Sequence, residues 1–194
     1  MNDIESVNNL ISLLKSIQGI SKKTAEKIVE GFILKSKMDQ SLIVETFRKL
    51  TQEIKNCEKC GNITDREVCE VCSDDFRENK LIIVDNHQVI TKFEKDKFYG
   101  GYYLIWDIDA SQDLEEGILE SYLNKLENAS KERSEVILAL SPTIAGEINK
   151  HFIKTTLRRL GIQSSELAIG IPMGANVDYI DSLTLKQSFL NRVK

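Results

Sequence analysis

The sequence predicts an α+β chain built from several modules, and three observations lead to this fold class. Helical patterns separated by a turn open the chain, four cysteines lie within a short central stretch, and short apolar runs alternate with helical patterns from residue 80 onwards. With 194 residues, of which 41% are hydrophobic, the chain is long enough for one ordinary domain plus smaller modules. We therefore expect a helical N-terminal region, a small four-cysteine module and an α/β domain with a mainly parallel sheet.

The N-terminal region is predicted to be a pair of helices joined by a short hairpin. Apolar residues recur at helical spacing over residues 4–16, which predicts a first helix with one apolar face. Gly19 is free to adopt a positive φ and end that helix, and Ser21 is a suitable N-cap for a second one. A further amphipathic helix is predicted over residues 40–56.

The second helix begins with basic residues, Lys22 and Lys23, and Lys27 follows one turn later. Lysines in a first turn oppose the helix dipole, so they cost stability unless an anion binds there. Free backbone N–H groups beside lysine side chains form a seat for a phosphate, and duplex DNA offers phosphates without regard to sequence. The alternative is an ordinary helical hairpin with solvated lysines. The net charge of −4 gives no general sign of nucleic-acid binding, although residues 1–56 hold nine basic against seven acidic residues.

Cys57, Cys60, Cys69 and Cys72 form two CxxC pairs separated by eight residues, and they are all the cysteines of the chain. Such spacing directs four sulfurs at one point, which predicts one structural zinc ion per chain with no open coordination position. An iron–sulfur cluster also takes four thiolates, but its usual spacings differ. Disulfides need an oxidising compartment. We see no charged-then-apolar leader and no apolar run long enough to span a membrane, so we expect a cytoplasmic protein with reduced thiols.

From residue 80 onwards, strands and helices are predicted to alternate. The strands are expected at 80–85, 100–108, 134–140 and 166–172, and the helices at 87–95, 114–129 and 143–161. This alternation predicts a mainly parallel sheet with helices on both faces. Tyr102, Tyr103 and Trp106 in the second strand are expected to be core or strand-face aromatics.

In sheets of this kind, functional groups gather beyond the carboxyl ends of the strands. Asp85 ends the first predicted strand, Asp107 and Asp109 lie at the end of the second, and Ser141 follows the third. Converging carboxylates at this rim would bind Mg²⁺ for phosphoryl transfer. The alternative is that they are solvated or capping carboxylates at strand ends. His87 and His151 have no neighbour in the sequence that suggests a catalytic triad.

The order of these parts resembles the RecR family of bacterial recombination mediator proteins over essentially the full length. The resemblance is carried by the hairpin at 17–28, the four cysteines, "IIVD" at 82–85, and the stretches 99–103, 135–147 and 167–185. The last of these, "LAIGIPMGANVDYIDSLTL", is the most specific.

The resemblance implies a helix-hairpin-helix DNA-binding region at 1–56, a four-cysteine zinc finger at 57–72, a Toprim domain at 79–174 and a C-terminal tail and helix at 175–194 involved in assembly. It also implies a non-catalytic DNA repair protein that forms a ring-shaped homotetramer and works with RecO and RecF to load RecA at single-strand gaps. The DNA contacts of the family's hairpin fall on Lys23 and Lys27, with Lys22 beside them.

This sequence departs from the family pattern at several positions. Ser21 stands where a second glycine is usual, Asp85 where a glutamate is usual, and Val89 and Ala145 where acids are usual. These changes leave fewer carboxylates at the rim. Two other functions stay open: a Mg²⁺-dependent Toprim nuclease or topoisomerase-like enzyme using Asp85, Asp107 and Asp109, and a zinc-ribbon interaction module with no DNA role.

Overall fold

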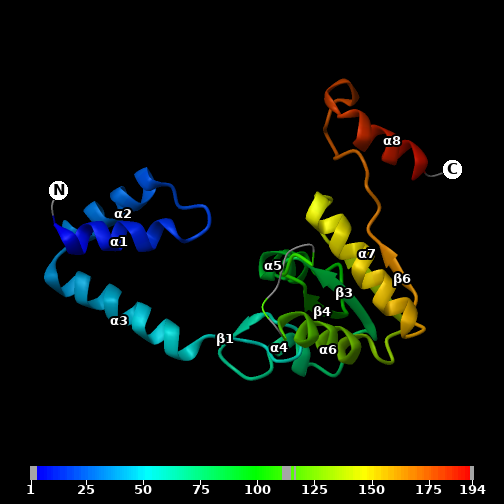
Figure 1. Cartoon of the computed structure of the whole chain (residues 1–194), viewed down its shortest axis with the longest axis horizontal. Helices are drawn as coiled ribbons and strands as arrows, with labels where there is room; N and C mark the ends of the chain where they lie inside the picture. The colour runs from blue at the N-terminus through cyan, green and yellow to red at the C-terminus, as the bar shows by residue number, and fades with distance from the viewer. Residues whose placement is uncertain (1–3, 111–114, 116, 193–194) are drawn as a thin grey trace. The chain divides into compact units, whose positions relative to one another are not determined.

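The computed structural model describes residues 4–110, 115 and 117–192. Within these residues the chain divides into two compact units (Figure 1), one ending at Ile54 and the other beginning at Lys55. The observed elements bear out the α+β class: a helical N-terminal unit precedes a four-cysteine cluster and a parallel sheet.

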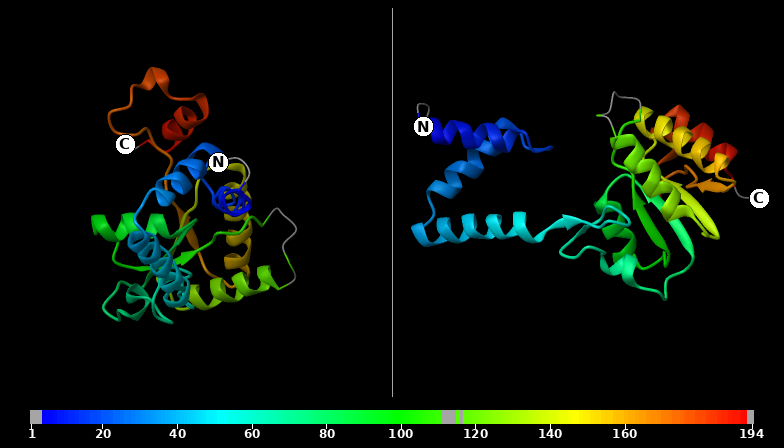
Figure 2. Two further views of the ribbon diagram at one scale, coloured as in Figure 1. Left: turned by 90° about the vertical axis from the view of Figure 1, so that its left-hand side faces the viewer. Right: turned by 60° about the horizontal axis from the view of Figure 1, so that its bottom comes forward.

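The N-terminal unit consists of helices α1 (Glu5–Lys15), α2 (Lys22–Ile33) and α3 (Lys37–Glu53), coloured blue to cyan in Figure 2. Gly19 adopts φ +85° in the turn between α1 and α2, and Ser21 caps α2 by accepting a hydrogen bond from the Thr24 N–H at 3.2 Å. Val7, Ala25 and Val29 are buried between the helices. The predicted helical hairpin is therefore confirmed.

Helix α3 differs from its predicted range of 40–56 at both ends. It begins at Lys37 with Ser36 as its N-cap, and it stops at Glu53 because Lys55–Asn56 forms strand β1 instead. The Gln40 side chain reaches the carbonyls of Phe32, Ile33 and Lys35 at 3.0–3.2 Å, which ties the start of α3 to the end of α2. No side chain of α3 is buried within the chain.

The second unit starts with the cysteine-rich segment. Strand β1 pairs antiparallel with β2 (Ile63–Thr64), and the short helix α4 (Glu70–Ser73) follows. The four cysteine side chains form a small buried cluster of their own, with Val68 and Val71 packed against it.

The α/β part alternates as predicted. Strands β3 (Lys80–Val84), β4 (Tyr102–Ile105), β5 (Glu135–Ala139) and β6 (Ser164–Glu166) pair in the order β4-β3-β5-β6, and each pairing is parallel. The connecting helices are α5 (His87–Asp96), α6 (Ile118–Ser130) and α7 (Ile144–Arg159). The helix predicted over 114–129 therefore starts later, after Gly117 with φ +86°, and residues 114 and 116 lie outside the described residues.

Helices cover both faces of this sheet (Figure 1). On one face, α6 and α7 pack over the larger core, whose most deeply buried members are Leu81, Ile83, Leu104, Trp106, Leu126, Val136, Leu138, Ile153 and Leu157. On the other face, α5 packs Ile90 against residues that include Ile82 and Tyr103. Trp106 and Tyr103 are thus core aromatics, as expected.

The prediction for the fourth strand is wrong. The apolar run at 166–172 indicated a buried strand, but β6 spans Ser164–Glu166, and only the Leu167 N–H continues the pairing by donating to the Leu138 carbonyl at 3.1 Å. Because β5 ends at Ala139, the residues after Leu167 have no strand beside them. Leu167 is 53% exposed and Ile171 is 37% exposed, so this run is not part of the core of its own chain.

The chain then forms a 3₁₀ turn (Val177–Tyr179) and helix α8 (Ser182–Leu190), which Asp181 caps. Neither element buries a side chain within this chain. Among the helices of the described ranges, none has both the length and the apolar character needed to cross a membrane.

Candidate zinc site and nucleic-acid-binding surface

The four cysteine sulfurs lie close enough together to hold one metal ion. All four are within 4.8 Å of one another, and the sulfurs of Cys60 and Cys69 are 3.6 Å apart. A tetrahedral zinc ion with Zn–S bonds of about 2.3 Å places its sulfurs about 3.8 Å apart. All four residues are buried, so the donor set and its geometry fit a closed structural zinc site.

Backbone amides hold two of these sulfurs in position. The Asn62 N–H donates to the Cys60 sulfur at 3.4 Å, and the Cys69 N–H donates to the Cys57 sulfur at 3.3 Å. The first CxxC pair turns tightly because the Gly61 N–H donates to the Cys57 carbonyl at 2.8 Å while Gly61 adopts φ +81°. Amide donors of this kind favour the thiolate form of the sulfur.

The pKa values of the cysteines are shifted in opposite directions within the cluster. Hydrogen bonds to Cys69 and Cys72, together with burial, raise the pKa of Cys60 far above its usual range. Hydrogen bonds from Cys60 and Cys72 lower the pKa of Cys69 to about 2. Without a cation the cluster keeps protons on some sulfurs, whereas Zn²⁺ replaces those protons and compensates four thiolates. The predicted structural zinc is thus supported by the donor chemistry as well as by the spacing.

The zinc module is attached to the sheet of the second unit. The Ile105 N–H, at the end of β4, donates to the Cys60 carbonyl at 2.8 Å, and the Tyr102 hydroxyl donates to the Asp74 carbonyl at 2.9 Å. A Cβ at position 61 would lie 3.4 Å from the Ile105 side chain, which shows how closely the first CxxC turn approaches the sheet.

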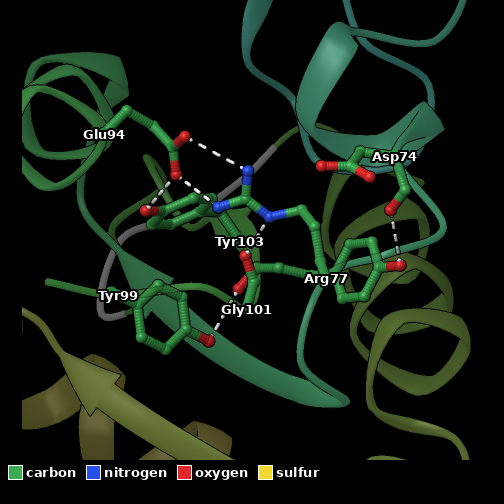
Figure 3. A network of polar contacts seen from close by, with 7 residues as sticks. Asp74, Arg77, Glu94, Tyr99, Gly101 and Tyr103 are labelled. Atoms are coloured by element: carbon green, nitrogen blue, oxygen red, sulfur yellow. Dashed lines mark hydrogen bonds and ion pairs between the residues drawn. The ribbon is translucent and has the colours of Figure 1, made fainter. Parts of the chain in front are cut away.

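Arg77 secures the segment that leads from the zinc module into β3 (Figure 3). Its guanidinium donates to both carboxylate oxygens of Glu94 on α5, and its Nε donates to the Gly101 carbonyl at 2.7 Å. The Tyr103 hydroxyl donates to Glu94 at 2.7 Å, and the Tyr99 hydroxyl donates to the Tyr102 carbonyl at 3.1 Å. Burial first, and then the bond to Glu94, raise the pKa of Tyr103 well above its usual range.

Lys22 and Lys23 are the first two residues of α2, and Lys27 follows one turn later. No acidic residue stands in the first turn of α2, within Lys22–Ile33. Lys22 lies 3.9 Å from Glu26, a loose and exposed ion pair. Lys23 and Lys27 are exposed and form no ion pair with any residue that the structure describes. Spaced by four residues, they lie on the same face of the helix.

Asp85 and Asp107, at the carboxyl ends of two strands, accept hydrogen bonds from other side chains. Asp85 accepts hydrogen bonds from the backbone N–H and the hydroxyl of Ser141, at 2.8 and 2.6 Å, which joins the ends of β3 and β5. Asp107 accepts a hydrogen bond from the Tyr122 hydroxyl. Within the ranges that the structure describes, the four cysteines are the one group of side chains placed to share a metal ion, so Asp85, Asp107 and Asp109 are not brought together as a ligand set.

Sequence reasoning missed the Arg77–Glu94 pair, because seventeen residues separate its members and neither belongs to a motif. The pairing of Ser141 with Asp85 could be anticipated in part, since both follow strands whose ends meet at one edge of a parallel sheet.

A helical hairpin, a closed four-cysteine zinc site and a parallel α/β domain together define a zinc-binding, multi-module α+β protein. Two family descriptions match this chain: the RecR zinc finger domain of the four-cysteine type over residues 54–74, and the RecR C-terminal region over residues 170–193.

Several curated relatives, each named recombination protein RecR, are similar to nearly the whole chain. The protein of Mycoplasmopsis pulmonis is 32% identical, covering 96% of this chain and 97% of its own length. That of Finegoldia magna is 32% identical, covering 97% and 96%. That of Phytoplasma mali is 33% identical, covering 99% and 96%. The chain belongs to the RecR family.

Proposed function

We propose that this protein acts in DNA repair and recombination as a non-catalytic, DNA-binding clamp. It would work with homologues of RecO and RecF to load RecA at single-strand gaps. The single observation that carries the DNA-binding part is the first half of α2, where Lys23 and, one turn later, Lys27 are exposed and form no ion pair within the described residues. The names of the relatives support the recombination role.

The parts of the chain would divide this work. Residues 1–56 would bind DNA, the zinc finger at 57–72 would brace the start of the α/β domain, residues 79–174 would form a Toprim-type scaffold that meets partner proteins, and residues 175–194 would take part in assembly. The bond from Ile105 to the Cys60 carbonyl supports the bracing role, because it fastens the zinc site to the sheet.

Assembly into a homotetrameric ring is supported by apolar surface that a single chain leaves uncovered. An apolar groove of about 620 Å³ lies on the N-terminal unit, lined mainly by side chains of α1, α2 and α3 that include Leu14, Phe32 and Phe47. Phe47 is 66% exposed and Leu42 is 63% exposed. Apolar patches of this kind mark interaction surfaces. Enclosure by several copies would let a few lysines per chain hold DNA despite a net charge of −4.

The proposal is tested by reversing the two lysine charges. We expect Lys23→Glu/Lys27→Glu to weaken duplex binding at least about tenfold in fluorescence anisotropy and to flatten the dependence of affinity on salt, because phosphate contacts release counterions. Lys92→Glu/Lys95→Glu on α5 makes the same charge change outside the N-terminal unit and serves as the control. Equal effects of both double variants, or no duplex binding by the unaltered protein at low salt, would refute the DNA-contact assignment.

The absence of catalysis is tested separately. Supercoiled and nicked DNA incubated with the protein and Mg²⁺ should stay intact. If the protein cleaves DNA and Asp107→Asn abolishes that cleavage, the non-catalytic proposal is wrong and the protein is an enzyme that uses the carboxylates at the strand ends.

A further inference from the structure

We propose that Cys72 is the modification site of the zinc module: peroxides and small electrophiles reach the zinc-binding thiolates at this residue, through a cavity between the zinc module and helix α6. Cys72 has the largest exposed fraction of the four cysteines. Cys57 and Cys60 are 1% exposed and Cys69 is 4% exposed, whereas Cys72 is 9% exposed. Reactivity of a thiolate follows its accessibility as well as its ionisation.

The cavity has a volume of about 410 Å³. Its walls come from the loop of the first CxxC pair, from Tyr102 on β4, and from Asn128 and Ala129 on α6. Of the four cysteines, Cys72 is the one that lines it. Since a water molecule occupies about 30 Å³ in the liquid, the cavity has room for hydrogen peroxide or a small alkylating reagent beside solvent.

The charges around the cavity favour anionic over neutral reagents. Three basic residues line it, Lys59, Lys125 and Arg133, against two acidic ones, Glu58 and Asp75. Arg133 is held in place, because its guanidinium stacks 4.1 Å from the centre of the Tyr102 ring and its Nε donates to the Ala129 carbonyl at 3.0 Å.

Lys59 is one of the basic residues that line the cavity. It is exposed and forms no ion pair with any residue in the described ranges. An anionic reagent is therefore attracted most directly by a side chain within the first zinc-binding turn.

The oxidation runs in two balanced steps. The Cys72 thiolate attacks one oxygen of hydrogen peroxide, so that an S–O bond forms, the O–O bond breaks and hydroxide leaves; the sulfur is oxidised to a sulfenic acid and the peroxide is reduced. A neighbouring thiolate then attacks the Cys72 sulfur, forming a disulfide as the S–O bond breaks and a second hydroxide leaves.

Within one chain the second thiolate can come only from the same site, because all four cysteines of the sequence belong to it. Their sulfurs lie within 4.8 Å of one another, so each of the other three is near enough to reach Cys72 after a small shift. A disulfide removes two of four ligands, and the metal is then lost.

The first test maps the order of modification. The zinc-loaded full chain is treated with less than one equivalent of N-ethylmaleimide, and separately of hydrogen peroxide, and the modified cysteine is located by peptide mass spectrometry while zinc release is followed with a chromogenic chelator. We expect Cys72 to carry most of the earliest N-ethylmaleimide label and to be one partner of the earliest disulfide that peroxide forms. Earliest label on Cys57, Cys60 or Cys69, or equal label on all four, would overturn the proposal.

The second test closes the cavity. Asn128→Trp should slow zinc release by peroxide several-fold at unchanged zinc content, while Asn124→Trp, one turn earlier on α6 and not among the lining residues, should leave the rate unchanged. Equal rates for the two variants would contradict entry through this cavity. If Asn128→Trp does not fold, Lys59→Gln decides: it should lower the reaction rate of iodoacetate more than that of iodoacetamide, and an unchanged ratio would count against the proposed wall.

Discussion

Gly146 shows how strongly a single residue constrains the turn between β5 and α7. A Cβ at this position would lie 1.9 Å from the Ser141 carbonyl oxygen and 3.2 Å from the Thr143 hydroxyl oxygen. The Gly146 N–H also donates to that hydroxyl, the cap of α7, at 3.1 Å. No side chain fits there unless the backbone of Ser141, whose N–H donates to Asp85, shifts.

We therefore expect Gly146→Ala to lower the free energy of unfolding by at least about 2 kcal/mol, because backbone atoms rather than a flexible side chain must give way. Gly170→Ala is the matched control, since its Cβ would meet nothing within 4 Å, and it should change stability by less than about 0.5 kcal/mol. Urea unfolding followed by circular dichroism measures both. Equal stabilities of the two variants would contradict the clash.

Tyrosines near the sheet couple stability to alkaline pH. Burial raises the pKa of Tyr99 above its ordinary value of 10.0, and Tyr103 and Tyr122 are raised as well. A raised pKa in the folded state means that the folded chain holds its proton where the unfolded chain has lost it. The stabilisation is complete below pH 10 and declines as the pH rises from there towards the folded pKa.

Tyr99→Phe should accordingly make the loss of stability above pH 10 less steep, by up to about 1.4 kcal/mol per pH unit. The measurement is the urea unfolding midpoint of the unaltered protein and of Tyr99→Phe at pH 8, 10 and 11. Subtracting one pH profile from the other removes the contributions of titrating groups that the two proteins share. Parallel pH profiles would show that Tyr99 ionises as readily in the folded state as in the unfolded one.

At the scale of elements, the ion pair between Arg77 and Glu94 helps to hold the segment after the zinc module against α5 and β4. The Arg77 side chain is 11% exposed and Glu94 is 34% exposed, so the pair is largely shielded from solvent. Loss of the cation would leave a carboxylate facing the Tyr103 hydroxyl in a site with little water.

Arg77→Met is expected to cost about 2 to 3 kcal/mol in unfolding free energy, less than for a fully buried pair because Glu94 is partly solvated. The double variant Arg77→Met/Glu94→Gln should recover part of that loss. Lys131→Met, which breaks a solvent-exposed ion pair with Glu127, should cost less than about 0.5 kcal/mol. Thermal unfolding of these three variants beside the unaltered protein tests the expected order of stabilities. An Arg77→Met variant as stable as Lys131→Met would show that the Arg77–Glu94 pair adds little stability.

Elements encoded by local patterns were predictable, and elements fixed by distant partners were not. The zinc site follows from spacing within sixteen residues, β3 follows from a short apolar run, and α5 follows from a helical pattern. The strand predicted at 166–172 failed because its length is set by β5, which ends before it, and not by its own apolar residues. Likewise, Lys55 and Asn56 were predicted to end the helix at 40–56, but they form strand β1 and pair with β2.

Of the candidate site, the chemistry of each residue could be predicted, but the burial of whole faces could not. The sequence identified the cysteines by type and position, whereas the assignment of Lys23 and Lys27 to DNA contact stays a prediction. It also indicated an apolar side on α3, yet periodicity alone does not say whether such a face is covered by its own chain. The structure leaves that face of α3 exposed, which matters for the assembly of several copies of the chain.

The exposed face of α3 is expected to be covered by a further copy of the chain. Phe47→Glu should therefore reduce the mass in solution from that of an oligomer towards the 22.1 kDa of one chain, because a buried charge would be left unpaired in the interface. Lys49→Glu introduces the same side chain two positions away on α3 and should leave the mass unchanged. Light scattering compares them, and an unaltered Phe47→Glu oligomer would show that α3 lies outside the interface.

The central place of β3 in the sheet has a consequence for biosynthesis. This strand is the first of the sheet to leave the ribosome, but its neighbours are β4, some twenty residues later, and β5, more than fifty residues later. The zinc ligands and the N-terminal helices, in contrast, are complete before residue 73. Metal capture and the helical unit therefore become available early in translation, while the apolar strand β3 waits about twenty residues of synthesis for its first partner and more than fifty for its second.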